Sequence, residues 1–226
     1  MPEHRRRPPW LAPEPRVLLV VAIAAALVLL FGKIAEDVIE HESGAFDRTI
    51  MLALRVPGDL AQPVGPHWLE EAFVNITSLG SPTIIALVTF VAVAYLVTAA
   101  RPRLALLVAL SIISGSIVEH LLKLGFDRAR PEIVPHLVTV NSLSFPSGHA
   151  MLSAVTYLSI GALLAKAQKR SRLRAFVLAV GVATTLLIGV SRVYLGVHYP
   201  TDVLAGWCAG ALWALIFWLI ARRVTR

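Results

Sequence analysis

Six long apolar stretches constrain what this chain can fold into. Each runs for 16 to 19 residues, close to the length of helix that crosses a hydrocarbon core about 30 Å thick. Because lipid offers no partners to backbone polar groups, each stretch must be helical. Six such helices in 226 residues predict an all-α integral membrane protein: one six-helix bundle that forms a single domain over residues 1–226. The stretches are Val17–Ile34, Pro82–Ala100, Leu104–Leu122, Ala150–Ala165, Ala175–Val190 and Val203–Ala221.

The overall composition excludes an ordinary soluble domain. Hydrophobic residues make up 57% of the chain and charged residues 15%, against roughly 25% charged residues in soluble domains. The pI of about 10.2 raises nucleic acid as a partner, but the basic excess is spread over loops and termini. We therefore predict the lipid bilayer as a partner and no nucleic acid. The single Cys208 lies inside an apolar stretch and excludes a disulfide framework.

The basic residues gather on one side of the predicted bundle. With a cytoplasmic N-terminus, 14 of the 21 basic residues and two of the 14 acidic residues fall inside, which is the bias that orients helical membrane proteins. We predict a multi-pass protein of the plasma (inner) membrane with both termini in the cytoplasm and residues 1–16 as a cytoplasmic tail. The first stretch is interpreted as an uncleaved anchor, because it lacks a clear small-residue cleavage site before Lys33.

The one long connection is the outer loop, residues 35–81, which holds eight acidic residues. Apolar residues recur every four positions on both sides of its prolines: Phe46, Ile50 and Leu54, then Trp68, Ala72 and Ile76. This spacing predicts two short amphipathic helices on the outer membrane surface. They form either a guide for a lipid substrate or a surface layer over the bundle. Ser81-Pro82 is expected to start the next helix as N-cap and first helical residue.

Three polar motifs lie at helix ends that this topology places on the same, outer side. The third stretch ends at Lys123, with Gly125 suited to a left-handed C-cap, and Arg130-Pro131 follows in the next connection. The fourth stretch begins at Pro146-Ser147-Gly148-His149. The fifth ends at Ser191-Arg192, with His198 and Asp202 in the turn to the sixth. Each motif alone is a weak signal, and a single cation is most simply an interfacial side chain. Three such motifs on the same side together predict a functional site there.

The residue types in these motifs suit a bound phosphate. A helix N-terminus has unpaired N–H groups and a partial positive charge, so Ser147 and Gly148 are expected to cradle an anion. Lys123 supplies a point charge, while the planar forks of Arg130 and Arg192 match phosphate oxygens in pairs.

Two histidines and a carboxylate supply the chemistry. His198 and Asp202 are four residues apart, and a helical turn would bring their side chains together. The carboxylate then accepts one ring N–H and fixes which nitrogen is free to attack. His149 is left as proton donor to the leaving oxygen. The same three residues are also a conceivable metal-ligand set. The neighbouring cations disfavour a dication, so we predict chemistry without metal or cofactor.

These motifs resemble the signature of the type 2 phosphatidic acid phosphatase superfamily: K-x6-R-P, P-S-G-H and S-R-x5-H-x3-D, matched here at Lys123–Pro131, Pro146–His149 and Ser191–Asp202. The resemblance implies a six-helix bundle and a metal-independent phosphatase that works through a phosphohistidine. By position, it implies His198 as nucleophile, Asp202 as its partner and His149 as general acid. It implies phosphate binding by Lys123, Arg130, Ser147, Gly148 and Arg192. Soluble haloperoxidases share the site, but a chain made mostly of membrane spans disfavours that activity.

The physiological substrate is less determined than the chemistry. An outward-facing site at the membrane interface selects an amphiphile with a phosphate head group. We expect undecaprenyl pyrophosphate, with phosphatidylglycerol phosphate, phosphatidate and lipid A as alternatives. A non-catalytic lipid-binding membrane protein is a more remote alternative. The sequence leaves the oligomeric state open.

Overall fold

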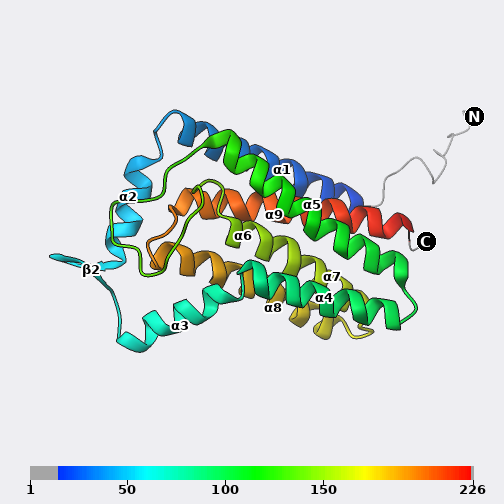
Figure 1. Cartoon of the computed structure of the whole chain (residues 1–226). Helices are drawn as coiled ribbons and strands as arrows, with labels where there is room; N and C mark the ends of the chain where they lie inside the picture. Colours follow the sequence, from blue (N-terminus) through cyan, green and yellow to red (C-terminus); the bar gives the residue numbers. More distant parts are fainter. Residues whose placement is uncertain (1–14, 225–226) are drawn as a thin grey trace, which may run out of the picture.

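The computed structural model describes residues 15–224 and is built almost entirely of helices. The long helices lie side by side along a common direction (Figure 1). They are α1 (Pro15–Ile39), α4 (Pro82–Thr98), α5 (Pro102–Phe126), α8 (Ser171–Tyr194) and α9 (Pro200–Val224). The fourth predicted stretch is formed by α6 (Gly148–Ser153), a π-helical segment η1 (Ala154–Leu158) and α7 (Ser159–Ala167), which follow one another without a break.

Helices occur at all six predicted stretches, but the number long and apolar enough to cross a membrane is five or six within residues 15–224. Helix α4 has 17 residues and qualifies only together with α3, from which it is bent by 51°. Large apolar side chains point outward from the bundle, as in Leu29 (74% exposed) and Phe90 (70% exposed). Such surfaces are stable only against lipid or another apolar partner.

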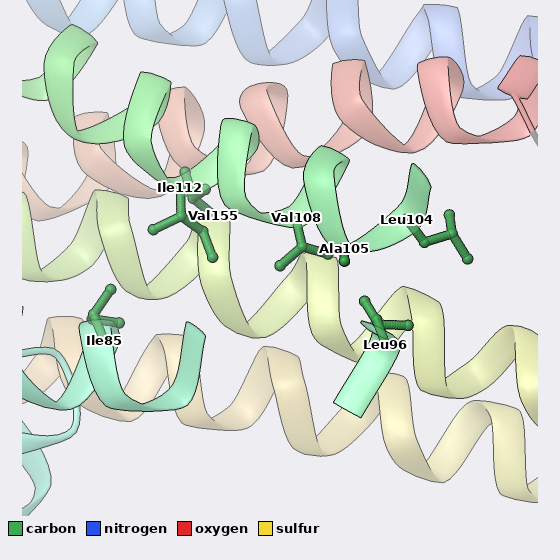
Figure 2. Close-up of a cluster of buried hydrophobic side chains, with 7 residues drawn as sticks. All are labelled: Ile85, Leu96, Leu104, Ala105, Val108, Ile112 and Val155. Atoms are coloured by element: carbon green, nitrogen blue, oxygen red, sulfur yellow. The ribbon is translucent and has the colours of Figure 1, made fainter. Parts of the chain in front are cut away.

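One hydrophobic cluster joins α4 and α5 to the middle of the bundle (Figure 2). Its buried members are Ile85, Leu96, Leu104, Ala105, Val108, Ile112 and Val155. Trp213 of α9 packs against this cluster and donates its indole N–H to the Ser111 carbonyl at 3.0 Å. The face of α5 that points into the bundle is thereby fixed against α9, and Lys123 lies in the last turn of α5.

The start of α6 lies directly against α9 because two glycines leave room for it. A Cβ at Gly206 would lie 2.7 Å from the carbonyl oxygen of Ser147, and a Cβ at Gly210 would collide with the Met151 carbonyl. Glycines four residues apart are the usual device for close helix contact in membranes. The backbone N–H of Ser147 also donates to the Asp202 carbonyl at 2.9 Å. The close approach therefore brings the second motif to the third.

The outer loop holds two helices, α2 (Gly44–Ala53) and α3 (His67–Ser78), near the predicted positions. Their placement on the membrane surface stays a prediction, since α3 also forms a bent pair with α4. Between them is an antiparallel hairpin that we did not predict, β1 (Arg55–Val56) and β2 (Asp59–Pro63). Its turn holds Pro57-Gly58 with Gly58 at φ +90°, a sequence that favours such turns.

The predicted helix ends had mixed outcomes. Ser81 caps α4 as expected, accepting the N–H of Ile84 at 3.4 Å, and Pro82 is the first helical residue. The prediction for Gly125 was wrong: α5 continues to Phe126, and Asp127 takes the left-handed conformation at φ 45°. Asp tolerates this conformation better than most residues. The first 14 residues of the predicted cytoplasmic tail lie outside the described residues.

The topology generates a labelling prediction. In a background with Cys208→Ala, cysteines at Asp59 and Glu132 should react with an impermeant thiol reagent from outside intact cells. Cysteines at Ala100 and Ser171 should react only after the membrane is opened, because one span separates each from its outer counterpart. All four positions are exposed on the protein surface. Labelling of Asp59 and Ala100 from the same side would show that α4 does not cross.

Candidate functional site

The three motifs meet at the end of the bundle that carries α2 and α3 (Figure 1). The connection between α5 and α6 bends over this end and is fixed there by two cations from the first motif. Lys123 donates to the Leu143 carbonyl at 2.7 Å and pairs with Glu119, one turn earlier in α5, at 3.3 Å. Arg130 donates to the Ser142 carbonyl at 2.6 Å. Both cations are therefore tied to the segment that leads into α6.

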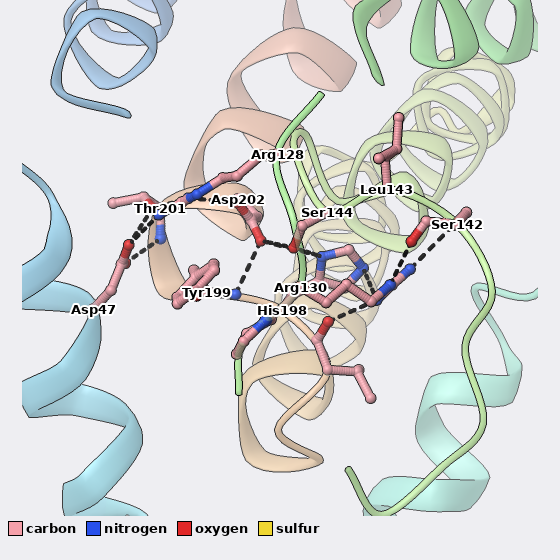
Figure 3. Close-up of polar contacts among 12 residues, drawn as sticks. Asp47, Arg128, Arg130, Ser142, Leu143, Ser144, His198, Tyr199, Thr201 and Asp202 are labelled. Atoms are coloured by element: carbon pink, nitrogen blue, oxygen red, sulfur yellow. Dashed lines mark hydrogen bonds and ion pairs between the residues drawn. The ribbon is translucent and has the colours of Figure 1, made fainter. Parts of the chain in front are cut away.

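Arg130 also reaches the third motif. One of its guanidinium nitrogens lies 2.6 Å from the Val197 carbonyl and 3.2 Å from Nε2 of His198. Since arginine only donates hydrogen bonds, Nε2 carries the lone pair and the ring proton is on Nδ1. Nδ1 faces Oδ2 of Asp202 at 3.3 Å. The predicted histidine–carboxylate pair is thus present, and Nε2 is the nitrogen turned toward Arg130 (Figure 3).

The His198–Asp202 contact forms without the helical turn that we expected at His198. Helix α9 begins only at Pro200, and Asp202 is its third residue. The Asp202 carboxylate reaches back over the helix start and accepts the backbone N–H of Tyr199 at 2.9 Å, one half of a capping box. The same turn back toward the helix start brings the carboxylate to His198.

The surroundings of His198 keep its ring neutral. The imidazole is buried, with 1% of its surface exposed. Burial, followed by the positive charges of Arg130, Arg192 and Lys123, lowers the pKa of His198 well below its usual value. Burial likewise lowers the pKa of Arg130, although a guanidinium stays charged at neutral pH. An unprotonated imidazole next to fixed cations suits a nucleophile that attacks an anionic group.

Two buried donors of the predicted phosphate cradle point to an anion. Ser147 Oγ and Arg192 Nε are both buried and have no hydrogen-bond partner among residues 15–224. Five other buried side-chain atoms in this range share this property, namely two nitrogens of Arg55 and the hydroxyls of Ser111, Thr156 and Ser159, but only these two belong to the predicted motifs. Buried polar groups are nearly always satisfied, and exceptions mark functional positions or missing ligands. Another nitrogen of Arg192 donates to Thr77 of α3 at 3.1 Å, which fixes the side chain. The unsatisfied donors come from two motifs that the sequence assigned to phosphate.

His149 follows Gly148 in the first turn of α6 and lies within electrostatic range of Arg192, His198 and the other two cations. It also lies close to the break between α3 and α4: a Cβ at Gly80 would be 3.1 Å from its Cδ2. The structure therefore brings together all eight residues that the sequence predicted for the site. Their roles stay predictions.

Sequence reasoning missed three residues at this site: Arg128 and Ser144, which contact Asp202, and Asp47, which contacts Arg128. Arg128 donates to Oδ1 of Asp202 at 2.6 Å and to Asp47 of α2 at 2.8 Å. Ser144 donates to Oδ2 of Asp202 at 2.5 Å. Arg128 lies within the six unspecified positions of the first motif, and Ser144 lies two residues before the second. Only that proximity could have signalled them.

The predicted alternative of a metal centre gains no support from the geometry. Within residues 15–224, no three His, Cys, Asp or Glu side chains are close enough together to hold a metal ion. Three cations lie beside the two histidines instead. Metal independence itself stays a prediction.

Gly148 generates a stability prediction. A Cβ at this position would collide with the Glu119 carboxylate, which is held by Lys123 at 3.3 Å, so Gly148→Ala should lower the free energy of unfolding by about 1–3 kcal/mol. Gly125→Ala is the matched control, because nothing lies within 4 Å of its added Cβ. Thermal unfolding midpoints in detergent measure both. Equal midpoints for the two variants would contradict the packing described here.

Comparison with known proteins identifies the family. The PAP2 superfamily matches residues 104–226. Phosphatidylglycerophosphatase B of Bacillus subtilis is 34% identical over 154 residues, which cover 68% of this chain and 74% of that protein. An undecaprenyl-diphosphatase of Sulfolobus acidocaldarius is 40% identical over 70 residues, or 30% of this chain and 29% of that protein.

The fold has a close counterpart among solved structures. The crystal structure of a transmembrane PAP2 type phosphatidylglycerolphosphate phosphatase from Bacillus subtilis superposes with a TM-score of 0.81 at 28% identity. It covers 90% of this chain and 98% of that one. The matched family region contains all three motifs, and the superposition extends to helices outside it. This chain therefore belongs to the PAP2 superfamily and is one of its multi-pass membrane phosphatases.

Proposed function

We propose that the protein removes a phosphate group from the head of a membrane lipid through a phosphohistidine on His198, without a metal ion, at the extracytoplasmic surface. The observation that carries the proposal is the pair of buried, unsatisfied donors, Ser147 Oγ and Arg192 Nε, beside a neutral imidazole that faces Arg130 at 3.2 Å. A phosphate bound there satisfies both donors and presents its phosphorus to the nucleophile.

The first half-reaction transfers the phosphoryl group to the enzyme. Nε2 of His198 attacks phosphorus while the bond to the leaving oxygen breaks, and His149 gives that oxygen a proton. The imidazole gains positive charge as the N–P bond forms, and the Asp202 carboxylate at 3.3 Å stabilises it. Lys123, Arg130 and Arg192 neutralise the charge on the transferred oxygens, which is the largest contribution expected of a phosphoryl-transfer site.

The second half-reaction returns the enzyme to its starting state. Water attacks the phosphohistidine, and the deprotonated His149 takes a proton from that water. The N–P bond breaks, the electron pair returns to Nε2 of His198, and inorganic phosphate leaves. Every proton and bond is accounted for by the two histidines and water, so no metal or cofactor enters the scheme.

The length over which each relative matches this chain favours a different first substrate from the one that the sequence predicted. The phosphatidylglycerophosphatase B match covers 68% of this chain, whereas the undecaprenyl-diphosphatase match covers 30%. We therefore propose phosphatidylglycerol phosphate as the first candidate and undecaprenyl pyrophosphate as the second. Lipid A is the third candidate: a lipid A 1-phosphatase matches 50% of this chain, but at 29% identity, against 40% identity for the undecaprenyl-diphosphatase. Phosphatidate has no support from these relatives.

A substrate panel tests this order. Purified enzyme in detergent is given each of the four lipids at equal surface fraction, and released phosphate is measured. We expect the highest kcat/KM with phosphatidylglycerol phosphate. A higher value with undecaprenyl pyrophosphate would make that lipid the substrate, and no release from any lipid would refute the phosphatase assignment.

The two histidines are separated by trapping the phosphoenzyme. His198→Ala should form no covalent intermediate and reduce turnover to background, because the attacking nitrogen is gone. His149→Ala removes only the proton donor, a contribution of about 10²–10⁴-fold, and a substrate with a good leaving group should restore part of the rate. Rapid acid-free quenching should then still trap acid-labile phosphate. Trapped phosphate in His198→Ala would reverse the assignment.

Chelation tests the absence of a metal. Since three cations already neutralise the phosphate, excess EDTA should leave turnover within about twofold of its starting value. Vanadate, which mimics five-coordinate phosphorus, should inhibit. Activity that is lost on chelation and restored by a divalent ion would show that a metal takes part.

A further inference from the structure

Arg128 lies between two buried carboxylates. One end of its guanidinium is 2.6 Å from Oδ1 of Asp202, and the other is 2.8 Å from Oδ2 of Asp47. Neither carboxylate side chain has any exposed surface, and Arg128 exposes 16% of its own. Figure 3 shows the three side chains in a line that leads from α2 through Asp202 to His198.

The secondary contacts lock this line in place. Asp47 accepts both the backbone N–H and the hydroxyl of Thr201, at 3.0 and 2.7 Å, so α2 is fixed to the first turn of α9. Arg128 donates to the Thr201 hydroxyl at 2.8 Å and stacks on the Tyr199 ring at 4.1 Å. Asp202 is therefore held from both sides: Arg128 at Oδ1, and Ser144 with the Tyr199 N–H at Oδ2.

This geometry excludes a direct phosphate contact as the main role of Arg128. Its two terminal nitrogens are used by Asp202, Thr201, Asp47 and Ser43. It binds Oδ1 of Asp202, whereas His198 faces Oδ2. Two carboxylates and one guanidinium also leave a net negative charge, which remains available to the imidazole when it becomes cationic.

We propose that Arg128 and Asp47 are positioning residues for the catalytic pair: they hold Asp202 turned toward His198, and this makes outer-loop helix α2 a working part of the site. The inference rests on the proposed function, because it needs His198 as nucleophile. It also gives the outer loop a role distinct from guiding lipid.

Arg128→Gln is the primary test. Loss of the bridge should lower kcat by about 10²-fold while KM changes by less than about threefold, since phosphate contacts are untouched. The acid limb of the kcat profile should move to higher pH, because Asp202 then acts on His198 alone and raises its proton affinity. Arg48→Gln is the control: Arg48 is an exposed arginine next to Asp47 on α2, and its loss should leave both quantities unchanged.

Two further variants keep the test decisive if Arg128→Gln folds poorly. Arg128→Gln leaves two buried carboxylates without a cation between them, so adding Asp47→Asn should raise both stability and kcat above those of the single variant. Arg128→Lys should restore less than half of the lost rate, because an ammonium cannot bridge two carboxylates as a planar fork does. The proposal would be overturned if the effects of Arg128→Gln and Asp47→Asn on kcat were additive. It would also be overturned if Arg128→Gln lowered kcat without moving the acid limb of the kcat–pH profile.

Phosphoenzyme trapping separates this proposal from the mechanism on which it rests. Arg128→Gln should still form the intermediate, more slowly, whereas His198→Ala should form none. Phosphate trapped at the normal rate in Arg128→Gln would overturn the positioning role alone. No intermediate in the unmodified protein would overturn the nucleophile assignment and the positioning role with it.

A second site, independent of the first, lies at the opposite end of the bundle. A groove of about 1350 Å³ opens between α4 and α5 on one side and α7 on the other. Apolar side chains such as Leu87, Val91 and Leu164 line its length. Five basic residues in or next to two connections, α4–α5 and α7–α8, also line it: Arg101, Arg103, Lys166, Lys169 and Arg174.

The charges around this groove are unbalanced. Within residues 15–224, every Asp and Glu lies on the side of the bundle that is predicted to face outward, and none lines the groove. Arg174 is held over the α7–α8 connection by donating to the Gln168 and Lys169 carbonyls at 2.9 and 3.1 Å. Apolar walls fit acyl chains, and a cluster of cations between spans on the cytoplasmic side fits an anionic lipid head group.

We infer that this groove binds one anionic phospholipid of the inner leaflet. The test adds phosphatidylglycerol or phosphatidylcholine to the detergent-solubilised protein and counts retained lipid by native mass spectrometry. Arg101→Gln/Arg103→Gln should weaken phosphatidylglycerol retention by about tenfold or more. Arg170→Gln/Arg172→Gln removes equal charge from the same end without lining the groove and should not.

Both double variants should keep the phosphatase activity of the unmodified protein, since they lie away from the candidate site. Equal loss of phosphatidylglycerol in the two variants would show general charge attraction rather than a groove. Equal retention of phosphatidylcholine and phosphatidylglycerol by the unmodified protein would show a merely apolar surface. Either result would overturn this inference.

Discussion

The outer end of the bundle is organised around one fully buried carboxylate, Asp202. A buried charge is stable only when donors surround it, and here four do so: Arg128, Ser144, the Tyr199 N–H and the His198 ring. These donors come from the α5–α6 connection and from the turn before α9. The need to satisfy one carboxylate therefore fixes both segments relative to each other, and His198, the proposed nucleophile, with them.

The anion site depends on a different constraint, the close approach of α6 to α9. Without side chains at Gly206 and Gly210, the backbone around Ser147 reaches α9 and donates to the Asp202 carbonyl at 2.9 Å. The helix start that we propose as the phosphate site is thereby placed next to His198, the proposed nucleophile. The packing of α6 on α9 and the proposed site therefore use the same contact, and this explains why glycines are needed at Gly206 and Gly210.

The cations are distributed so that each has a distinct neighbour. Lys123 is paired with Glu119 and Arg128 with two carboxylates, whereas Arg192 keeps a buried nitrogen unsatisfied. Arg128 therefore holds the scaffold, whereas Arg192 has a donor to spare for a bound anion. This end of the bundle thus combines paired charges, which hold the segments in place, with buried donors that lack an acceptor. Such donors can bind a phosphate through charge-assisted hydrogen bonds.

The sequence by itself determined where the long helices lie and that α4 starts at Ser81-Pro82, because each depends on short-range physics. It also predicted eight site residues, which the structure places at one end of the bundle and whose roles stay predictions. Run length fixes a spanning helix, proline fixes a first turn, and residue type fixes what a side chain can bind. Only the tertiary structure decided that Arg128 lies between Asp47 and Asp202, which are 81 and 74 residues away, and that Ser144 contacts the carboxylate. Those contacts depend on the path of two connections whose local sequence allows many conformations. Buried charges such as Asp202 find their partners only when these distant segments meet, and this requirement selects one conformation.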